Sequence, residues 1–204
     1  KFVPLSPDVN FSTAAKDDMV GQAKFIRALM HFRLSNVFGV QFAQNPSGNG
    51  LSVPLVLTPF EGNISVPARS TLLQVYTQIE NDLLDASTKI TNTAKSKATV
   101  AAAKGLLARL YLYQGRWGEA ANMANDVINT SGISLASNYA FYNANSTEHV
   151  FQLLNIAGDA AGAQSYSNLF NGTNFGGRGD CPFSQDLRDL FALESGDIRV
   201  SATL

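Results

Sequence analysis

The chain has 204 residues, of which 45% are hydrophobic and 15% are charged, and its formal net charge is -1. This length and hydrophobic share are enough for a buried core, so we expect a single domain over residues 1–204. The low charge, without any block of Lys or Arg, argues against nucleic acid or an anionic membrane surface as the main partner. The only cysteine, Cys181, excludes an internal disulfide framework, so packing alone must hold the fold.

The first predicted helix spans residues 17–39, "DDMVGQAKFIRALMHFRLSNVFG", and either Ser12 or Thr13 can cap its start. Its apolar residues spread over most of the helix circumference. They leave one narrow polar stripe, which consists of Lys24, Arg27, His31 and Ser35. We therefore expect this helix to be largely buried.

A turn-rich loop follows, and then a short extended run at 51–59 in which Pro54 and Pro59 exclude a central strand. The second predicted helix spans residues 70–87. Thr71 and Gln74 have the spacing of a capping box. The apolar residues form one face: Leu72, Tyr76, Ile79, Leu83 and Ala86. This pattern predicts an amphipathic helix packed on one side.

A helical hairpin is predicted from Thr99 to Ile128, with its turn at Gly115, which can take the left-handed conformation that ends a helix. Alanines allow its two helices to approach closely. The residues from 133 onward are rich in Asn, Gly, Ser and aromatics and are expected to be mostly loop. Two elements are predicted within them, a strand at 149–154 and a helix at 184–199 that Ser184 caps and Gly196 ends.

The hairpin matches the tetratricopeptide pattern in one clean copy. Its packing residues are Ala108, Tyr111, Gly115, Trp117, Ala120 and Val127, and Trp117 is expected in the core. Its neighbours occur in a specific order: "GQAKFIRALMHFRLSNVFG", "VPLVL", "PARSTLLQVYTQIENDLLDA", the hairpin itself, "EHVFQLLN" and "DLRDLFALESGDIR". This ordered set resembles the SusD/RagB family of outer-membrane nutrient-binding lipoproteins of Bacteroidetes.

The resemblance implies a mainly α fold of tetratricopeptide-like hairpins with long irregular loops and little β structure. It implies a surface-exposed protein, lipid-anchored in the outer membrane, that binds carbohydrate for glycan uptake in polysaccharide utilisation. It further implies no catalysis and no cofactor, and a SusC-type TonB-dependent transporter as partner. The family's lipid-bearing cysteine is absent from this chain and members continue beyond the "GDIR" segment, so we expect the chain to be part of a longer protein.

A sugar is bound by a planar aromatic ring against its C–H face, with amides and guanidinium groups on its hydroxyls. Residues 164–178 combine these groups in a Gly-rich segment, and residues 138–145, "NYAFYNAN", repeat the pattern. The candidate ligand-binding residues are Tyr142, Tyr166, Asn168, Phe170, Asn174, Phe175 and Arg178. The competing interpretation is that these aromatics only anchor long loops to the helical body.

Two other functional classes stay open. A tetratricopeptide scaffold for protein–protein interaction would hold a peptide in a concave groove, but that calls for several clean repeats. A glycosidase needs two facing carboxylates, and the loop acids Asp159 and Asp180 are the first to test. The helical acids, such as Asp82 and Asp85, are interpreted as solvated faces. Two distant histidines and one cysteine have no metal-ligand spacing, so no metal is expected.

Overall fold

The computed structural model describes residues 12–59, 62, 66–130, 132–136, 146–153, 173, 177–180 and 184–193. Within these ranges the elements are the helices α1 (Thr13–Phe38), α2 (Leu72–Lys89), α3 (Val100–Tyr113), α4 (Trp117–Ile128) and α6 (Gln185–Ala192). The β structure of the described ranges is one isolated bridge between Leu51 and Thr71. The mainly α fold is therefore confirmed. None of the described helices has the length and apolar composition to cross a membrane.

The chain forms two compact units. The first comprises Lys1–Ser137 with Phe141–Leu153 and contains α1 to α4, and the second comprises Asn138–Ala140 with Leu154–Leu204 and contains α6. Much of the second unit lies outside the described residues, and the expectation of one domain over 1–204 stays a prediction.

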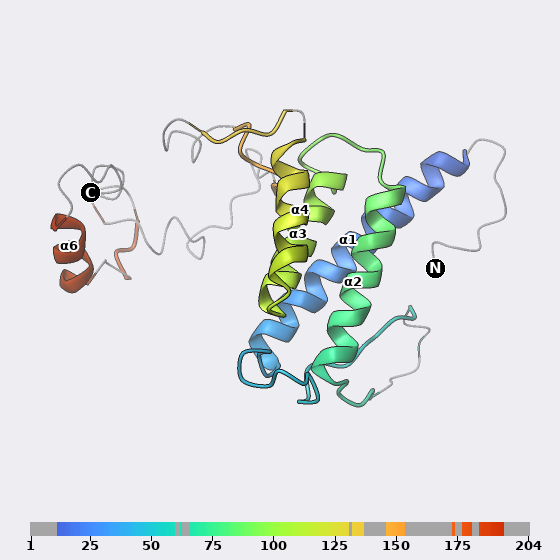
Figure 1. Cartoon of the computed structure of the whole chain (residues 1–204), viewed down its shortest axis with the longest axis horizontal. Helices are drawn as coiled ribbons and strands as arrows, with labels where there is room; N and C mark the ends of the chain where they lie inside the picture. The colour runs from blue at the N-terminus through green and yellow to red at the C-terminus, as the bar shows by residue number, and fades with distance from the viewer. Residues whose placement is uncertain are drawn as a thin grey trace. The chain divides into compact units, whose positions relative to one another are not determined.

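The first unit is a bundle in which each helix packs on the next in sequence (Figure 1). Contacts at both ends show that α1 and α2 run antiparallel. Ser35 near the end of α1 bonds Ser52, whose amide donates to the Ser70 carbonyl just before α2. At the other end, Asp18 in the first turns of α1 accepts from the Thr91 amide just after α2. The α3–α4 pair is also antiparallel, because Lys104 in the second turn of α3 pairs with Asp126 near the end of α4. The α3–α4 pair, joined by the short turn at 114–116, has the arrangement of a tetratricopeptide-like hairpin.

The core lies where α1, α2 and α3 meet. Its largest fully buried side chains include Tyr76, Ile79 and Leu83 of α2 and Leu107 of α3. The Tyr76 ring also meets two phenylalanine rings edge to face, with centroid distances of 6.0 Å to Phe32 and 4.9 Å to Phe42. Each buried aliphatic or aromatic side chain contributes about 1.5–3 kcal/mol. The single apolar face predicted for the second helix is thus confirmed as the centre of the core.

The predicted caps are confirmed, and α1 begins at Thr13, directly after its cap and before the predicted start at residue 17. Ser12 Oγ accepts from the Ala15 amide at 3.2 Å, which decides between the two candidate caps of α1. Thr71 and Gln74 form the complete capping box, with hydrogen bonds of 3.2 Å and 2.9 Å. Ser184 caps α6. Each of these capping signals is contained within four consecutive residues and needs no tertiary contact.

The prediction that the first helix, α1, is largely buried is wrong. The helix is apolar on two opposite faces, and of these the face with Phe25 and Phe32 packs into the core of the bundle. Six large apolar side chains of the helix are exposed: Met19, Ile26, Met30, Leu34 and Val37 on the other face, and Phe38 at its end. A helix that is apolar on all sides is fully buried only where other parts of a protein cover each of its faces.

The polar stripe of the same helix faces α2 instead of solvent. Lys24 Nζ lies 2.7 Å from Asp85 Oδ2, and Arg27 NH2 lies 2.6 Å from Asp82 Oδ1. Asp82 is only 1% exposed, so its interpretation as part of a solvated face is wrong. The reason is that the acids of the second helix and the bases of the first form cross-helix ion pairs.

Two predictions near the C-terminus need correction. Residues 149–153 form no strand; this stretch is tied to the bundle by a hydrogen bond of 2.9 Å from the Gln152 amide to the Lys95 carbonyl. The last helix ends at Ala192, within the predicted range 184–199, and positions 194–199 lie outside the described residues. Leu190 of this helix is exposed.

Candidate functional site

Arg178 is the only one of the sequence-predicted binding residues that the structure describes. It forms an ion pair with Asp180, 2.7 Å from NH2 to Oδ2, and both side chains are nearly half exposed. Asp180, one of the two candidate acids, is therefore paired with a base. The other predicted residues lie outside the described ranges: Tyr142, Tyr166, Asn168, Phe170, Asn174, Phe175 and the acid Asp159. Their role in binding stays a prediction.

Within the described residues, no group of three or more His, Cys, Asp or Glu side chains is placed to hold a metal ion. The described part of the chain instead contains two hollows at the end of the bundle where α1 ends and α2 begins. They differ in what lines them.

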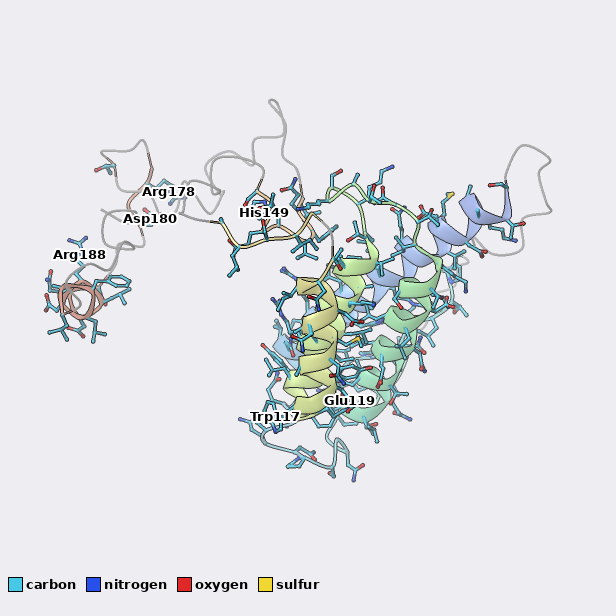
Figure 2. All side chains as sticks on the ribbon, turned by 45° about the horizontal axis from the view of Figure 1, so that its top comes forward. Trp117, Glu119, His149, Arg178, Asp180 and Arg188 are labelled. Carbon is cyan, nitrogen blue, oxygen red and sulfur yellow. The ribbon has the colours of Figure 1, made fainter. Side chains whose placement is uncertain are left out.

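The first, here called the end hollow, has a volume of about 560 Å³ and is formed by the loop after α1 and the turn between α3 and α4. Its lining is aromatic, aliphatic and amide: Gln41, Phe42, Ala43, Pro46, Leu112, Tyr113, Gln114, Gly115 and Trp117. Figure 2 shows Trp117 at this end of the bundle, at the start of α4. The volume of the end hollow falls within the range of about 300–1,000 Å³ that is typical of small-molecule sites.

Trp117 was predicted to lie in the core, and that prediction is wrong, because the residue is 66% exposed. Trp117 is the first residue of α4, and the α3–α4 contact is made by the buried Ala120 and Val127 instead. Gly115, with φ of +74°, turns the chain so that the Trp117 ring lies against the outside of the turn. The predicted left-handed glycine is thus confirmed.

Tyr113 supplies a second accessible ring and is 44% exposed. One part of it is fixed, because its ring meets Phe32 of the core edge to face with centroids 5.3 Å apart. Phe42, on the opposite wall, is buried and packs edge to face on Tyr76. The walls of the end hollow are therefore extensions of the core and not free loops.

An ion-pair network lies beside the turn. Arg116 stacks its guanidinium 4.1 Å from the centroid of the Tyr111 ring and bonds Glu80 through NH1 at 2.9 Å and NH2 at 3.1 Å. The same guanidinium donates from Nε to Glu119 at 2.6 Å and from NH1 to the Gln114 amide oxygen at 3.2 Å. Two carboxylates thus neutralise the one base next to the hollow.

The network shifts the pKa values of Arg116, Glu119 and Tyr111. Hydrogen bonds to Glu119 and Glu80 raise the pKa of Arg116, and the bond from Arg116 lowers the pKa of Glu119. Burial, together with the hydrogen bond to Glu80, raises the pKa of Tyr111 to about 12. At neutral pH the arginine is charged and held in place, and the tyrosine keeps its proton.

The second hollow, of about 570 Å³, is lined mainly by aliphatic and proline side chains, with Arg69 at its edge. The Arg69 donors are already engaged by backbone carbonyls: Nε by Ser52 at 2.5 Å, and NH2 by Phe38 at 3.0 Å and Leu51 at 2.9 Å. This arginine joins the end of α1 to the segment before α2. Its guanidinium thus stabilises the fold through three hydrogen bonds to backbone carbonyls.

Sequence reasoning missed the end hollow although one signal was present. Tyr113 and Trp117 bracket the left-handed Gly115, and rings on either side of a tight turn point away from the helix–helix contact. The loop residues Gln41 and Phe42 could not have been added, because their approach to the turn depends on the packing of α1 against α2 and α3.

The chain is similar to a family of known proteins. A family model described as "Starch-binding associating with outer membrane" matches residues 5–112. Among solved structures, a putative sugar-binding protein from Bacteroides vulgatus shares 32% identity over 85% of this chain and 41% of its own, with a TM-score of 0.72. None of the curated proteins matches the chain.

Two further structures extend the comparison. A SusD superfamily protein from Bacteroides thetaiotaomicron shares 30% identity over 67% of this chain and 29% of its own, with a TM-score of 0.58. A laminarin-binding SusD-like protein shares 30% identity over the same fractions, 67% and 29%, with a TM-score of 0.53. The chain thus spans less than half the length of each of these structures. Because the family model covers more than half of the 204 residues and the fold agrees, this chain belongs to the SusD-like family.

Proposed function

We propose that this protein binds carbohydrate at the cell surface for nutrient uptake and is not itself an enzyme. The observation that carries the proposal is the match of residues 5–112 to a family described as starch-binding. It is supported by structural similarity to a sugar-binding protein and to a laminarin-binding protein, at 32% and 30% identity. Starch and laminarin are both glucose polymers, so soluble glucans are the first ligands to test.

We also propose that the protein works at the outer membrane, held there by a lipid anchor in its full-length form, together with a SusC-type TonB-dependent transporter. The support is the family description, which associates these proteins with the outer membrane. Co-purification from solubilised outer membranes of the native organism tests this partnership. A protein recovered without any TonB-dependent transporter, under conditions that preserve known transporter complexes, would contradict it.

Isothermal titration calorimetry against a panel of soluble starch, laminarin, xylan and pectin tests the binding function. We expect saturable heat with at least one of them and no release of reducing ends on prolonged incubation. Heat with peptides and with none of the glycans would instead favour the tetratricopeptide-type interaction scaffold. Release of reducing ends that disappears in Asp180→Asn would favour the glycosidase alternative.

A further inference from the structure

We propose that the end hollow is a subsite for one ring of a neutral hexose oligosaccharide, with Trp117 as the stacking platform. The inference rests on the proposed function and specifies where, and for what class of sugar, the described part of the chain provides a site. Four features of the end hollow support it step by step: exposed aromatic surface, unused hydrogen-bonding atoms, absence of free charge and fixed walls.

The first step is the accessible aromatic surface. Trp117 is 66% exposed and Tyr113 is 44% exposed, although both line a hollow beside the core. Exposed aromatic side chains gathered around a hollow are a typical sign of a binding surface. A pyranose ring presents a face of C–H groups to such a platform and directs its hydroxyls outward toward polar partners.

The second step is that the amides of the lining have one acceptor and one donor to offer. Gln41 uses Nε2 to bond the Asn36 carbonyl at 3.0 Å, which fixes the orientation of its amide. Gln114 uses Oε1 to accept from Arg116 at 3.2 Å, so its amide is fixed by the oxygen and its nitrogen is left available. Among the described residues, neither Gln41 Oε1 nor Gln114 Nε2 has a further partner. An acceptor and a donor together suit hydroxyl groups, which can both donate and accept.

The third step concerns charge. The described residues that line the end hollow include no charged side chain. The nearest base, Arg116, is saturated by Glu80 and Glu119, so the local charge of these three groups is not positive. A uronate or sulfated sugar would find no free cation here and would meet two nearby carboxylates. The hollow therefore suits a neutral sugar.

The fourth step is that the walls are held in place before a ligand arrives. Tyr113 packs on Phe32, Phe42 packs on Tyr76, and Gly115 fixes the turn between them. A preorganised site loses less conformational entropy on binding, which increases its affinity for a weakly bound ligand such as a sugar.

Trp117 provides the test, because it is the only tryptophan of the sequence and its fluorescence therefore reports on the end hollow alone. The whole chain is titrated with maltoheptaose, laminarihexaose and an oligogalacturonide, and both the emission maximum and quenching by iodide are followed. We expect a neutral oligosaccharide to shift the emission to shorter wavelength and to protect the indole, with the same midpoint as its calorimetric titration. The oligogalacturonide should leave the emission unchanged.

Trp117→Ala should weaken calorimetric binding of the neutral oligosaccharide about two- to tenfold, and Trp117→Phe should weaken it less. Ile128→Ala is the matched control, because Ile128 is 68% exposed on the same helix but outside the hollow, and it should leave binding unchanged. Circular dichroism verifies that each variant is folded.

Three outcomes would overturn the inference, and they separate it from the proposed function. Saturable calorimetric binding without a change in Trp117 emission places the sugar elsewhere, so the subsite fails and the function stands. A response to oligogalacturonide alone refutes the neutral class. Absence of heat with every glycan of the panel removes both the proposed function and the subsite.

Discussion

The cross-helix pair between Arg27 and Asp82 should be the most sensitive polar contact of the bundle. Asp82 accepts from Arg27 Nε at 2.7 Å and from NH2 at 2.6 Å, and a third bond comes from Gln78 Nε2 at 3.1 Å. The two side chains differ in burial, with 33% of Arg27 and 2% of Asp82 exposed. The bond to Asp82 raises the pKa of Arg27, so the arginine stays charged in the native state.

This difference in burial predicts an order of effects. Arg27→Met leaves the Asp82 carboxylate buried with one neutral donor, and loss of one partner of a buried pair costs about 3–5 kcal/mol. Asp82→Asn keeps the shape and one acceptor, and the partly exposed Arg27 can recover water. We expect that variant to lose about 1.5–3 kcal/mol, the contribution of hydrogen bonds to a charged group.

Urea unfolding followed by far-ultraviolet circular dichroism measures both free energies. The double variant Arg27→Met with Asp82→Leu should recover most of the loss, because the buried charge is removed together with its partner. Asp126→Asn is the control. Its ion pair with Lys104 should contribute less than about 1 kcal/mol, because 45% of the Asp126 side chain and 31% of the Lys104 side chain are exposed. The reasoning is refuted if Asp82→Asn costs more than Arg27→Met, or if both cost less than the control.

Three other predictions concern the same bundle. His31 Nδ1 is buried without a hydrogen-bond partner among the described residues. Burial and the positive charge of Arg27 lower the pKa of His31 below 6.5, and the negative charge of Asp82 opposes this shift only in part. The contribution of His31 to stability is therefore complete above about pH 6.5 and is lost as the pH falls toward the pKa of the native state. Urea unfolding at several pH values should show this decrease in the free energy of unfolding, and His31→Leu should abolish it. Gly21→Ala should destabilise the fold by about 1–3 kcal/mol in thermal or urea unfolding, because a Cβ there would lie 2.8 Å from Ile90 Cγ1 and 3.1 Å from its backbone nitrogen. Gly105→Ala, whose Cβ would meet only ordinary contact at 4.0 Å, should stabilise it by about 0.5–1 kcal/mol, and equal effects at the two glycines would contradict the packing argument. Gly115→Ala should cost about 1–2 kcal/mol because its φ is +74°, with Gly115→Asn less severe by the same measurement.

The elements that could be predicted are those with local signals. The second helix has one apolar face and a capping box of four residues, and both are present in α2 as expected. The hairpin turn needs only a left-handed glycine between two helical runs, and Gly115 supplies it. Such features depend on contacts within about one helical turn, which a sequence displays directly.

The contacts that could not be predicted join distant parts of the chain. Arg27 and Asp82 are 55 positions apart, and each alone has the sequence pattern of a solvated charge on a helix. The first helix is apolar on two faces, and periodicity does not say which of them is covered. The binding residues predicted at 138–145 and 164–178 depended on composition, and of these only Arg178 lies within the described residues.

Trp117 illustrates how a packing motif can contain a binding residue. Ala120 and Val127 bury their side chains against α3 and account for the α3–α4 contact, so the hairpin does not need the indole for its packing. The turn is closed by Gly115 and tied to α2 through Arg116 and Glu80, neither of which depends on Trp117. The indole therefore occupies a position whose backbone is rigid and whose side chain is free of a structural task. A rigid backbone with an uncommitted aromatic ring is what a stacking platform requires, because a ligand then meets the ring without first having to order it.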